Sequence, residues 1–316
     1  MRKDAEMRLA HALRLSVGWL ALMAAASVTA SEASSWAVRM ASQYQVTPNL
    51  TYLTADGYES KLDVIAPSDP PEQLPTLLYI HGGGWVGGTK ERAMLRLLPY
   101  LEMGFAVVNV EYRLASVALA PAAVEDGRCA LRWVLSNADS YGFDPDRIVV
   151  SGHSAGGHLA LTTGILPASA GLDRRCPARN PAGGRADAHE PEMRVAAIVN
   201  WYGITDVADL VHGPNAKTYA VAWMAGLTDW QAVAERVSPL SHVRSGLPPI
   251  LTIHGDADAI VPFDHAVRLH QALDGAAVPA KLHVIEGGGH GRFTDAESLG
   301  AYQAIREFLI GQGVIE

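Results

Sequence analysis

The chain has 316 residues, which is enough for one large domain or two small ones. Hydrophobic residues make up 49% of it and charged residues 18%, a balance that can bury a sizeable core and excludes an intrinsically disordered protein. The formal net charge is −8, and no block rich in lysine and arginine is present, so nothing in the composition favours nucleic-acid binding.

The N-terminus has the three-part layout of a secretory signal peptide. Residues 1–14 carry four basic side chains, residues 15–28 are uncharged and apolar, and Val28-Thr29-Ala30 offers small residues for cleavage. We expect cleavage after Ala30, which removes four basic and two acidic residues and leaves a net charge of −10 on residues 31–316. An uncleaved N-terminal anchor is the alternative, although the apolar segment is short for a membrane span. The prediction is a periplasmic or secreted protein with no stable membrane association after the signal is removed.

Export would place the two cysteines, Cys129 and Cys176, in an oxidising compartment. Cys129 lies in a helical pattern and Cys176 in a polar loop. The sequence does not place their Cα atoms, so it leaves open whether the two residues form a disulfide. No Cys/His spacing typical of a zinc site is present.

Hydrophobic periodicity predicts strands and helices in alternation along the chain. Two strands joined by Asp56-Gly57 come first, and most later strands are continuous apolar runs. The expected strands cover residues 49–53, 58–65, 76–80, 105–110, 147–151, 195–201, 250–254 and 281–285. The expected helices cover residues 91–103, 121–140, 229–237, 263–273 and 295–310, with another beginning at Gly156. This order predicts an α/β fold with a mainly parallel sheet covered by helices on both faces.

Two segments interrupt this pattern. Residues 167–192 hold four prolines, a Gly-Gly pair and four arginines, and we expect either a solvated insertion with no role or a small lid over the site. Residues 211–226 include Tyr219, Trp223 and Met224, which could equally supply apolar substrate contacts or pack in the core.

Ser154 lies in a Gly-x-Ser-x-Gly motif, Gly152 to Gly156, between a short apolar strand and a helix. A serine on so sharp a strand-to-helix turn takes a strained backbone conformation that leaves room only for very small neighbours. A glycine-rich turn with a chance serine is the alternative. The motif predicts Ser154 as a nucleophile, which needs a base within hydrogen-bond reach and a third group to orient that base.

The acid and the base should follow the serine in the chain. Asp256 and Asp258 both come after the apolar run 250–253, where active sites of open α/β sheets form, and spacing leaves the choice between them open. Of the four histidines beyond these acids, three fall in helical or strand patterns. The fourth, His290, lies in the glycine-rich loop 286–291 and is the expected base; a histidine without a role in that loop is the alternative.

The run His81-Gly82-Gly83-Gly84-Trp85 also follows a strand directly. Acyl transfer creates an oxyanion, and backbone amides reach an anion closely only where no Cβ intervenes. We expect the N–H groups of Gly83, Gly84 and Ala155 to donate to that oxyanion, and Trp85 to contact substrate. A phosphate-binding loop is the competing interpretation, but the run lacks the Gly-Lys-Ser/Thr of a P-loop and the spacing of a dinucleotide fingerprint.

From about Asp56 to its end the chain resembles the α/β-hydrolase serine esterases of the hormone-sensitive-lipase-like and feruloyl/acetyl-xylan esterase-like (BD-FAE-like) groups. The motifs that carry the resemblance are residues 81–85, 111–114, 121–126, 152–158, 254–258 and 261–262, together with His290. In such families the acid is the last residue of His-Gly-x-x-Asp, which selects Asp258 over Asp256. The resemblance likewise assigns Gly83, Gly84 and Ala155 to an oxyanion hole.

The resemblance implies one α/β-hydrolase domain, residues 31–316, with a mainly parallel sheet, no large cap domain, and no cofactor or metal. It implies hydrolysis of short-chain acyl or aryl esters through Ser154, His290 and Asp258, with acetylated or feruloylated plant polysaccharide among the substrates. The alternatives are a peptidase or amidase of the prolyl-oligopeptidase type, for whose propeller the chain has no room, and a catalytically silent binding protein. Arg113 and Asp126 are expected to form a structural ion pair, and His158 to pack on the nucleophile helix.

Overall fold

The computed structural model describes residues 35–70, 73–177 and 192–316, which divide into two compact units. The smaller unit takes in Met1–Gln45 and Pro67–Asp69; within it residues 35–43 are helical, and Ser68 N donates to the carbonyl oxygen of Gln43. The larger unit takes in Val46–Ala66 and Pro70–Glu316. The expected signal peptide, residues 1–30, lies outside the described residues.

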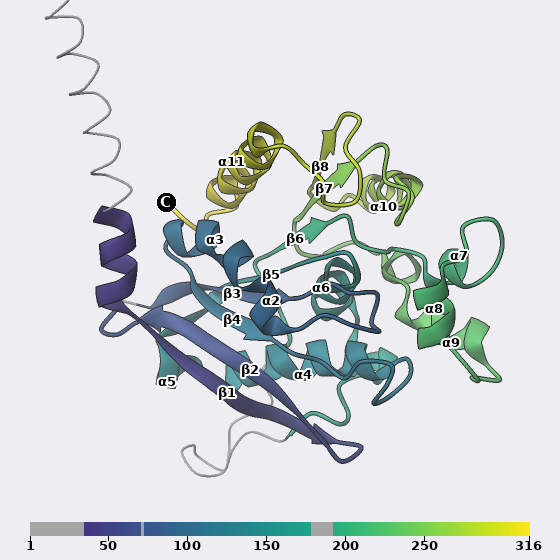
Figure 1. The fold of residues 1–316 in the computed structure, drawn as a ribbon, viewed down its shortest axis with the longest axis horizontal. Coiled ribbons are helices and arrows are strands. Elements are labelled where there is room, and N and C mark those ends of the chain that lie inside the picture. The colour runs from purple at the N-terminus through teal and green to yellow at the C-terminus, as the bar shows by residue number, and fades with distance from the viewer. Residues whose placement is uncertain (1–34, 71–72, 178–191) are drawn as a thin grey trace, which may run out of the picture. The chain divides into compact units, whose positions relative to one another are not determined.

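Eight strands of the described chain form one sheet in the order β1-β2-β4-β3-β5-β6-β7-β8 (Figure 1). The strands are β1 Tyr44–Ala55, β2 Tyr58–Pro67, β3 Leu74–Ile80, β4 Ala106–Val110, β5 Phe143–His153, β6 Ala197–Trp201, β7 Ile250–Gly255 and β8 Ala280–Ile285. β2 runs antiparallel to β4, and every pairing from β4 to β8 is parallel. The prediction of a mainly parallel sheet is confirmed.

The helices are α2 Lys90–Ala93, α3 Leu98–Glu102, α4 Ala122–Ser136, α5 Ala138–Tyr141, α6 Ala155–Ile165, α7 Val207–Val211, α8 Thr218–Trp223, α9 Trp230–Val237, α10 Asp264–Gly275 and α11 Asp295–Gly311. Three short 3₁₀ helices accompany them: η1 Met94–Leu97, η2 Ala168–Ala170 and η3 Pro239–His242. Hydrophobic periodicity did not predict α7, α8 and η3, which lie between β6 and β7. Within the described ranges no helix is both long and apolar enough to cross a lipid bilayer.

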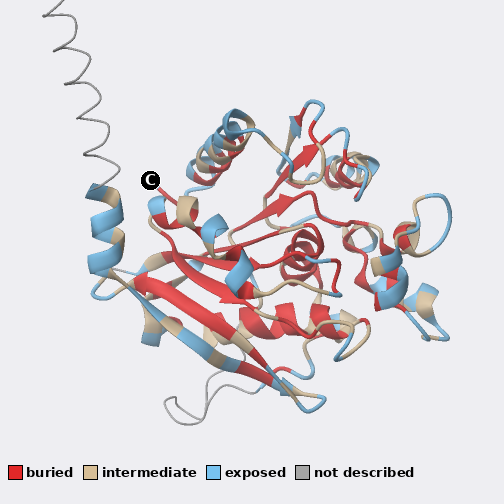
Figure 2. Ribbon diagram, viewed as in Figure 1, coloured by how far each residue is buried: buried red, intermediate tan, exposed pale blue. Residues whose placement is uncertain are grey.

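Helices cover both faces of the sheet. Successive side chains of a strand point to opposite faces. In β3, the Tyr79 ring lies 6.4 Å from that of Tyr100 on α3, whereas Ile80 Cδ1 lies 3.6 Å from the position of a Cβ on Gly127 of α4. α3 and α4 therefore lie on opposite faces, α6 packs beside α4, and both α6 and the central strands are buried (Figure 2).

The helix expected over residues 91–103 is broken into α2, η1 and α3. Pro99 lies in the first turn of α3. It has no N–H to donate, and its ring would clash with the carbonyl oxygen of Leu95 in a continuous α-helix. The chain ahead of it tightens into the 3₁₀ geometry of η1. The apolar spacing correctly predicted a helical segment here, but it did not predict that the segment is interrupted at η1.

Arg113 is fully buried beside three carboxylates. Its Nε and Nη2 donate to Asp126 at 2.9 and 2.7 Å, its Nη2 lies 3.2 Å from Glu125, and its Nη1 donates to Asp56. Asp56 belongs to the β1–β2 turn, so this network joins that turn to α4. The prediction of a structural ion pair between Arg113 and Asp126 is confirmed.

Cys129 and Cys176 form a disulfide, with Cα atoms 4.8 Å apart. The bond joins α4 to the segment that follows α6. α6 starts at the carboxyl end of β5 and returns along the sheet, so its last turn lies at the amino ends of the strands. From there the chain runs back along α4, because Arg175 donates to Asp56 of the β1–β2 turn at 2.8 Å. The solvated insertion and the lid both remain predictions for this segment, of which residues 178–191 lie outside the described chain.

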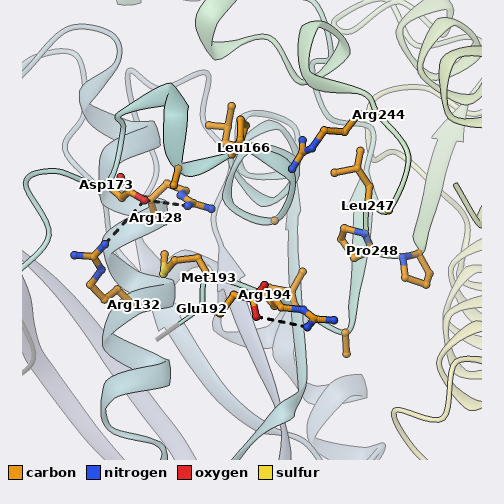
Figure 3. Close-up of a pocket in the computed structure, with 17 residues that line it drawn as sticks. Arg128, Arg132, Leu166, Asp173, Glu192, Met193, Arg194, Arg244, Leu247 and Pro248 are labelled. Atoms are coloured by element: carbon orange, nitrogen blue, oxygen red, sulfur yellow. Dashed lines mark hydrogen bonds and ion pairs between the residues drawn. The ribbon is translucent and has the colours of Figure 1, made fainter. Parts of the chain in front are cut away.

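A cavity of about 820 Å³, the far-end cavity, lies at this amino end of the sheet (Figure 3). Its walls come from α4, from the segment after α6, and from the residues that precede β6 and β7. Arg128 donates to the carbonyl oxygen of Thr163 at 2.9 Å, and Arg244 donates to that of Ile165 at 2.6 Å. Two guanidinium groups thus bind carbonyls of the last turn of α6, where a helix leaves carbonyls without partners and favours cations.

Candidate active site

Ser154 occupies the turn between β5 and α6, and its backbone is strained, with φ of 57° and ψ of −123°. The turn is also crowded. A Cβ on Gly152 would lie 2.4 Å from the carbonyl oxygens of both Ile80 and Gly156, and a Cβ on Gly156 would lie 2.1 Å from that of Ile80. Only glycine fits at these two positions, as expected for a serine on a sharp strand-to-helix turn.

The imidazole of His290 lies between Ser154 and Asp258. Its Nδ1 is 2.6 Å from Asp258 Oδ2, and its Nε2 is 2.8 Å from Ser154 Oγ. An ionised carboxylate only accepts hydrogen bonds, so Nδ1 donates to Asp258. In the neutral ring Nε2 then carries a lone pair and accepts the hydroxyl proton of Ser154, which is the arrangement a base needs.

Four groups hold the carboxylate of Asp258. Oδ2 accepts from His290, and Oδ1 accepts from the backbone N–H groups of Ile260 and Val261 at 2.8 and 3.0 Å. His254 Nε2 lies 3.4 Å from Oδ2 and 3.0 Å from the carbonyl oxygen of Val261, so Nε2 carries the proton. Burial alone would raise the pKa of Asp258, but hydrogen bonds from His254 and His290 outweigh it and hold the pKa well below its usual range.

Asp256, the other candidate acid, does not bond His290. Its Oδ1 accepts from the backbone N–H of Gly287 at 2.6 Å, so it links the loop after β7 to the loop after β8. Spacing alone left the two aspartates equal, and the structure brings only Asp258 to His290. The sequence analysis quoted His254 within a motif without giving it a function; the signal available was a histidine at the end of a buried strand, four residues before the acid.

The glycine loop, residues 81–85, follows β3. Gly83 has φ of 131°, and a Cβ there would lie 1.9 Å from the carbonyl oxygen of Gly87. Gly84 has φ of 61°, and a Cβ there would lie 2.8 Å from the side chain of Tyr219. Among the described residues no acceptor binds the N–H groups of Gly83, Gly84 and Ala155. These three donors are the ones that the sequence analysis expected to face an oxyanion.

Trp85, at the end of the glycine loop, is fully buried. Its ring stacks on Trp223 at 4.1 Å, and its Nε1 donates to Nδ1 of His158 at 3.2 Å. The prediction that Trp85 contacts substrate is therefore wrong for its side chain, because an indole that follows a positive-φ glycine turns into the core. Trp223 and Met224 are buried as well, and of that segment only Tyr219 lies against Gly84.

His158 is buried in α6, where its Nε2 donates to the carbonyl oxygen of Val237 at 2.8 Å. Burial lowers the pKa of His158 to about 4, so the ring is neutral at pH 7. The prediction that it packs on the nucleophile helix is confirmed.

Tyr202, directly after β6, is a site residue that the sequence analysis missed. It has φ of 38°, and its ring centroid lies 4.7 Å from that of His290 at an interplanar angle of 65°. Its hydroxyl lies beside Arg96 and 2.4 Å from the position of a Cβ on Gly291. Tyr202 thus packs edge-on against the imidazole of His290, and its hydroxyl leaves no room for a Cβ at position 291, directly after that histidine. The only sequence signal was an aromatic residue at the end of a buried strand.

In the part of the chain that the structure describes, no group of three or more His, Cys, Asp or Glu side chains is placed so that it could hold a metal ion.

The family model named BD-FAE matches residues 62–273, which include the glycine loop, Ser154 and Asp258. The chain belongs to the BD-FAE family. This membership agrees with the resemblance drawn from the motifs.

Curated relatives of this family member carry esterase names. Esterase LipQ of Mycobacterium tuberculosis is 30% identical over 226 residues, 69% of this chain and 50% of the relative. Esterase LipC of the same organism is 29% identical over 247 residues, 76% of this chain and 58% of the relative. The chain therefore spans about half the length of these two relatives.

Solved structures of esterases share the fold. Esterase Est2 of Thermogutta terrifontis with bound propionate is 25% identical, with a TM-score of 0.68 over 87% of this chain and 96% of that chain. A truncated carbohydrate esterase from gut microbiota is 28% identical, with a TM-score of 0.68 over 85% of this chain and 96% of that chain. The prediction of an α/β-hydrolase fold is confirmed.

Proposed function

We propose that the protein is a serine carboxylesterase with Ser154 as nucleophile, His290 as base and acid, and Asp258 as the group that orients the imidazole. The observation that carries the proposal is the continuous hydrogen-bonded chain from Asp258 through His290 to Ser154, with links of 2.6 and 2.8 Å. Nucleophile, base and orienting carboxylate at such distances are what activation of a serine hydroxyl requires. The esterase names of the relatives support the same reaction.

In the proposed mechanism Ser154 Oγ bonds to the ester carbonyl carbon while His290 Nε2 takes the hydroxyl proton. The carbonyl oxygen becomes an oxyanion, to which the N–H groups of Gly83, Gly84 and Ala155 donate at the positive end of α6. The bond to the leaving alcohol then breaks as Nε2 gives the proton to the alcohol oxygen. Water then gives a proton to His290 Nε2 as its oxygen bonds to the acyl carbon. The bond from that carbon to Ser154 Oγ breaks, Nε2 returns the proton to Oγ, and the acid is released.

The proposed substrates are short-chain acyl or aryl esters, with acetylated or feruloylated plant polysaccharide among them. Tyr219 lies against Gly84, and Trp85 and Trp223 fill the space behind the glycine loop, which limits the room beside the nucleophile. Est2 of Thermogutta terrifontis was solved with propionate and with butyrate bound, which supports small acyl groups. The carbohydrate esterase among the similar structures supports a sugar ester.

We also propose that residues 1–30 are a signal peptide and that residues 31–316 form the exported catalytic domain. The disulfide between Cys129 and Cys176 supports export, since disulfides persist in oxidising compartments. Mass spectrometry of protein recovered from the periplasm or medium should give an N-terminus at Ser31. Recovery of the full chain from the membrane fraction would contradict the proposal.

The central test is hydrolysis of p-nitrophenyl esters from acetate to laurate. Wild type should prefer acetate or butyrate, and Ser154→Ala should lose at least about 10⁴-fold in kcat. Ser169→Ala, an exposed serine of η2, is the matched control and should behave as wild type. Paraoxon should phosphorylate Ser154, as the relative from Thermogutta terrifontis is phosphorylated. If wild type is as inert as Ser154→Ala on every ester and takes no label, the proposal fails, and amide substrates are the next to test.

A further inference from the structure

A cavity of about 280 Å³, the side cavity, lies beside the glycine loop. Its lining includes Gly82 and Gly83 of that loop and His153, the residue before the nucleophile. Arg92 and Arg96 line the other side. A substrate group that enters this cavity therefore lies next to the reacting carbonyl and meets two guanidinium groups.

The positive charge of the side cavity has no direct counter-charge. No aspartate or glutamate is among the described residues that line it, and no described acid forms an ion pair with Arg92 or Arg96. Glu91, their neighbour in sequence, has its carboxylate 2.7 Å from Lys90 Nζ. The two arginines are therefore available to an anion brought by a ligand, in a protein whose net charge is −8.

The histidines of the side cavity add no charge. Burial lowers the pKa of His153 to about 3 and that of His81 to about 4, so both rings are neutral at pH 7. His153 Nδ1 lies 3.1 Å from the hydroxyl of Tyr79, and His81 Nδ1 donates to the carbonyl oxygen of Gly82 at 2.8 Å. At neutral pH the charge that faces a ligand is that of the two arginines.

Arg96 lies beside the hydroxyl of Tyr202, whose ring packs against His290. Arg92 lies four residues earlier in α2, where Thr89 Oγ1 accepts from its backbone N–H at 3.3 Å, whereas Arg96 belongs to the 3₁₀ segment η1. Both side chains line the side cavity, and each guanidinium is a planar fork of N–H donors that can bind a carboxylate with two parallel bonds.

From this arrangement we infer that the protein selects esters that also carry a carboxylate, which Arg92 and Arg96 bind in the side cavity. The inference rests on the proposed ester hydrolysis and names the substrate class. The carboxylate belongs to the part of the substrate that reaches the side cavity, either the acyl chain or the alcohol. The chemistry of recognition is the same in both cases, and paired substrates separate them.

The test compares matched neutral and anionic esters. On the acyl side, p-nitrophenyl hemisuccinate is paired with p-nitrophenyl butyrate. On the alcohol side, 4-carboxyphenyl butyrate is paired with its methyl ester. The readout is the ratio of kcat/KM, anionic to neutral, within each pair. In the productive pair, Arg92→Gln should lower this ratio about tenfold, mainly through KM, and Arg92→Glu should lower it further. Arg92→Lys keeps the charge and should retain most of the preference.

Two controls make the result specific. Arg194→Gln removes an exposed arginine at the far-end cavity and should leave the ratio unchanged. Raising the salt concentration from 20 to 500 mM should reduce the wild-type ratio, because exposed charges are screened.

If Arg92→Gln and Arg92→Glu leave both ratios within twofold of wild type while the neutral esters are hydrolysed, the inference is wrong and the proposed esterase stands. If neither member of any pair is hydrolysed, the proposed function itself fails.

Discussion

Opening the disulfide should lower the free energy of unfolding by about 4 kcal/mol. The bond joins Cys129 and Cys176 across a sequence separation of 47 residues. The chain-entropy relation for a loop of that length gives about 4 kcal/mol at 25 °C, because the cross-link removes open conformations of the unfolded chain. The double variant Cys129→Ala/Cys176→Ala is preferred to serine, since both positions are buried and a buried hydroxyl without a partner adds its own cost.

The assay is urea unfolding of three samples: oxidised wild type, wild type held in reductant, and the double alanine variant. Reduced wild type keeps both sulfur atoms and isolates the cross-link, whereas the double variant also loses their packing. Activity at 25 °C should survive in both, because the disulfide joins α4 to the segment after α6 and includes no residue of the proposed catalytic group. If reduced wild type and the double variant both unfold within about 1 kcal/mol of oxidised wild type, the loop-entropy reasoning is refuted.

Three further predictions concern the site and its supports. Asp258→Asn should lower kcat about 10⁴-fold, because it favours the wrong tautomer of the His290 imidazole. Asp256→Asn should retain most activity, because the Asp256 carboxylate bonds the backbone N–H of Gly287 instead. Equal losses of kcat in the two variants would contradict the assignment of Asp258 as the orienting carboxylate. Gly156→Ala should lose several kcal/mol in thermal unfolding or fail to fold, because its Cβ would lie 2.1 Å from a backbone oxygen; a normal melting temperature would contradict this. Burial lowers the pKa of His158 from 6.5 to about 4, so between these pH values the unfolded chain binds more protons than the folded protein. As the pH falls from 8 to 5, His158 should therefore lower the free energy of unfolding by about 2 kcal/mol. His158→Gln should remove that part of the pH dependence in urea unfolding at the two pH values, and an unchanged dependence would show the reasoning to be wrong.

Local patterns predicted much of the fold and of the site. The apolar runs that became β3, β5 and β7 are continuous because these strands are buried on both faces, and the residues after them fall at one edge of the sheet. Ser154 and His290 could be found this way because glycine-rich turns follow their strands. Choosing Asp258 over Asp256 needed family resemblance, since both acids follow the same strand at nearly the same distance.

Other features depend on contacts between distant segments, which one sequence does not encode as a pattern. Tyr202 meets His290 only because β6 and the loop after β8 converge at the sheet edge. Trp85 was predicted to contact substrate because it ends the glycine loop. Its ring instead packs in the core against Trp223, which lies 138 positions later in the sequence. The disulfide was undecided for the same reason, since it joins α4 to a segment 47 residues away.

The nucleophile helix is restrained at both ends. α6 begins beside Ser154 and ends at Ile165, where Arg128 and Arg244 bind carbonyl oxygens of its last turn. Both arginines line the far-end cavity (Figure 3). Eleven residues at 1.5 Å each make a rod of about 16 Å that is much stiffer along its axis than the loops around it. The rod acts as a strut, so an axial slip of a few tenths of an ångström at the arginine end would displace Ser154 Oγ relative to His290 by a similar amount. The position of the Ser154 hydroxyl thus depends partly on two arginine side chains at the opposite end of the sheet.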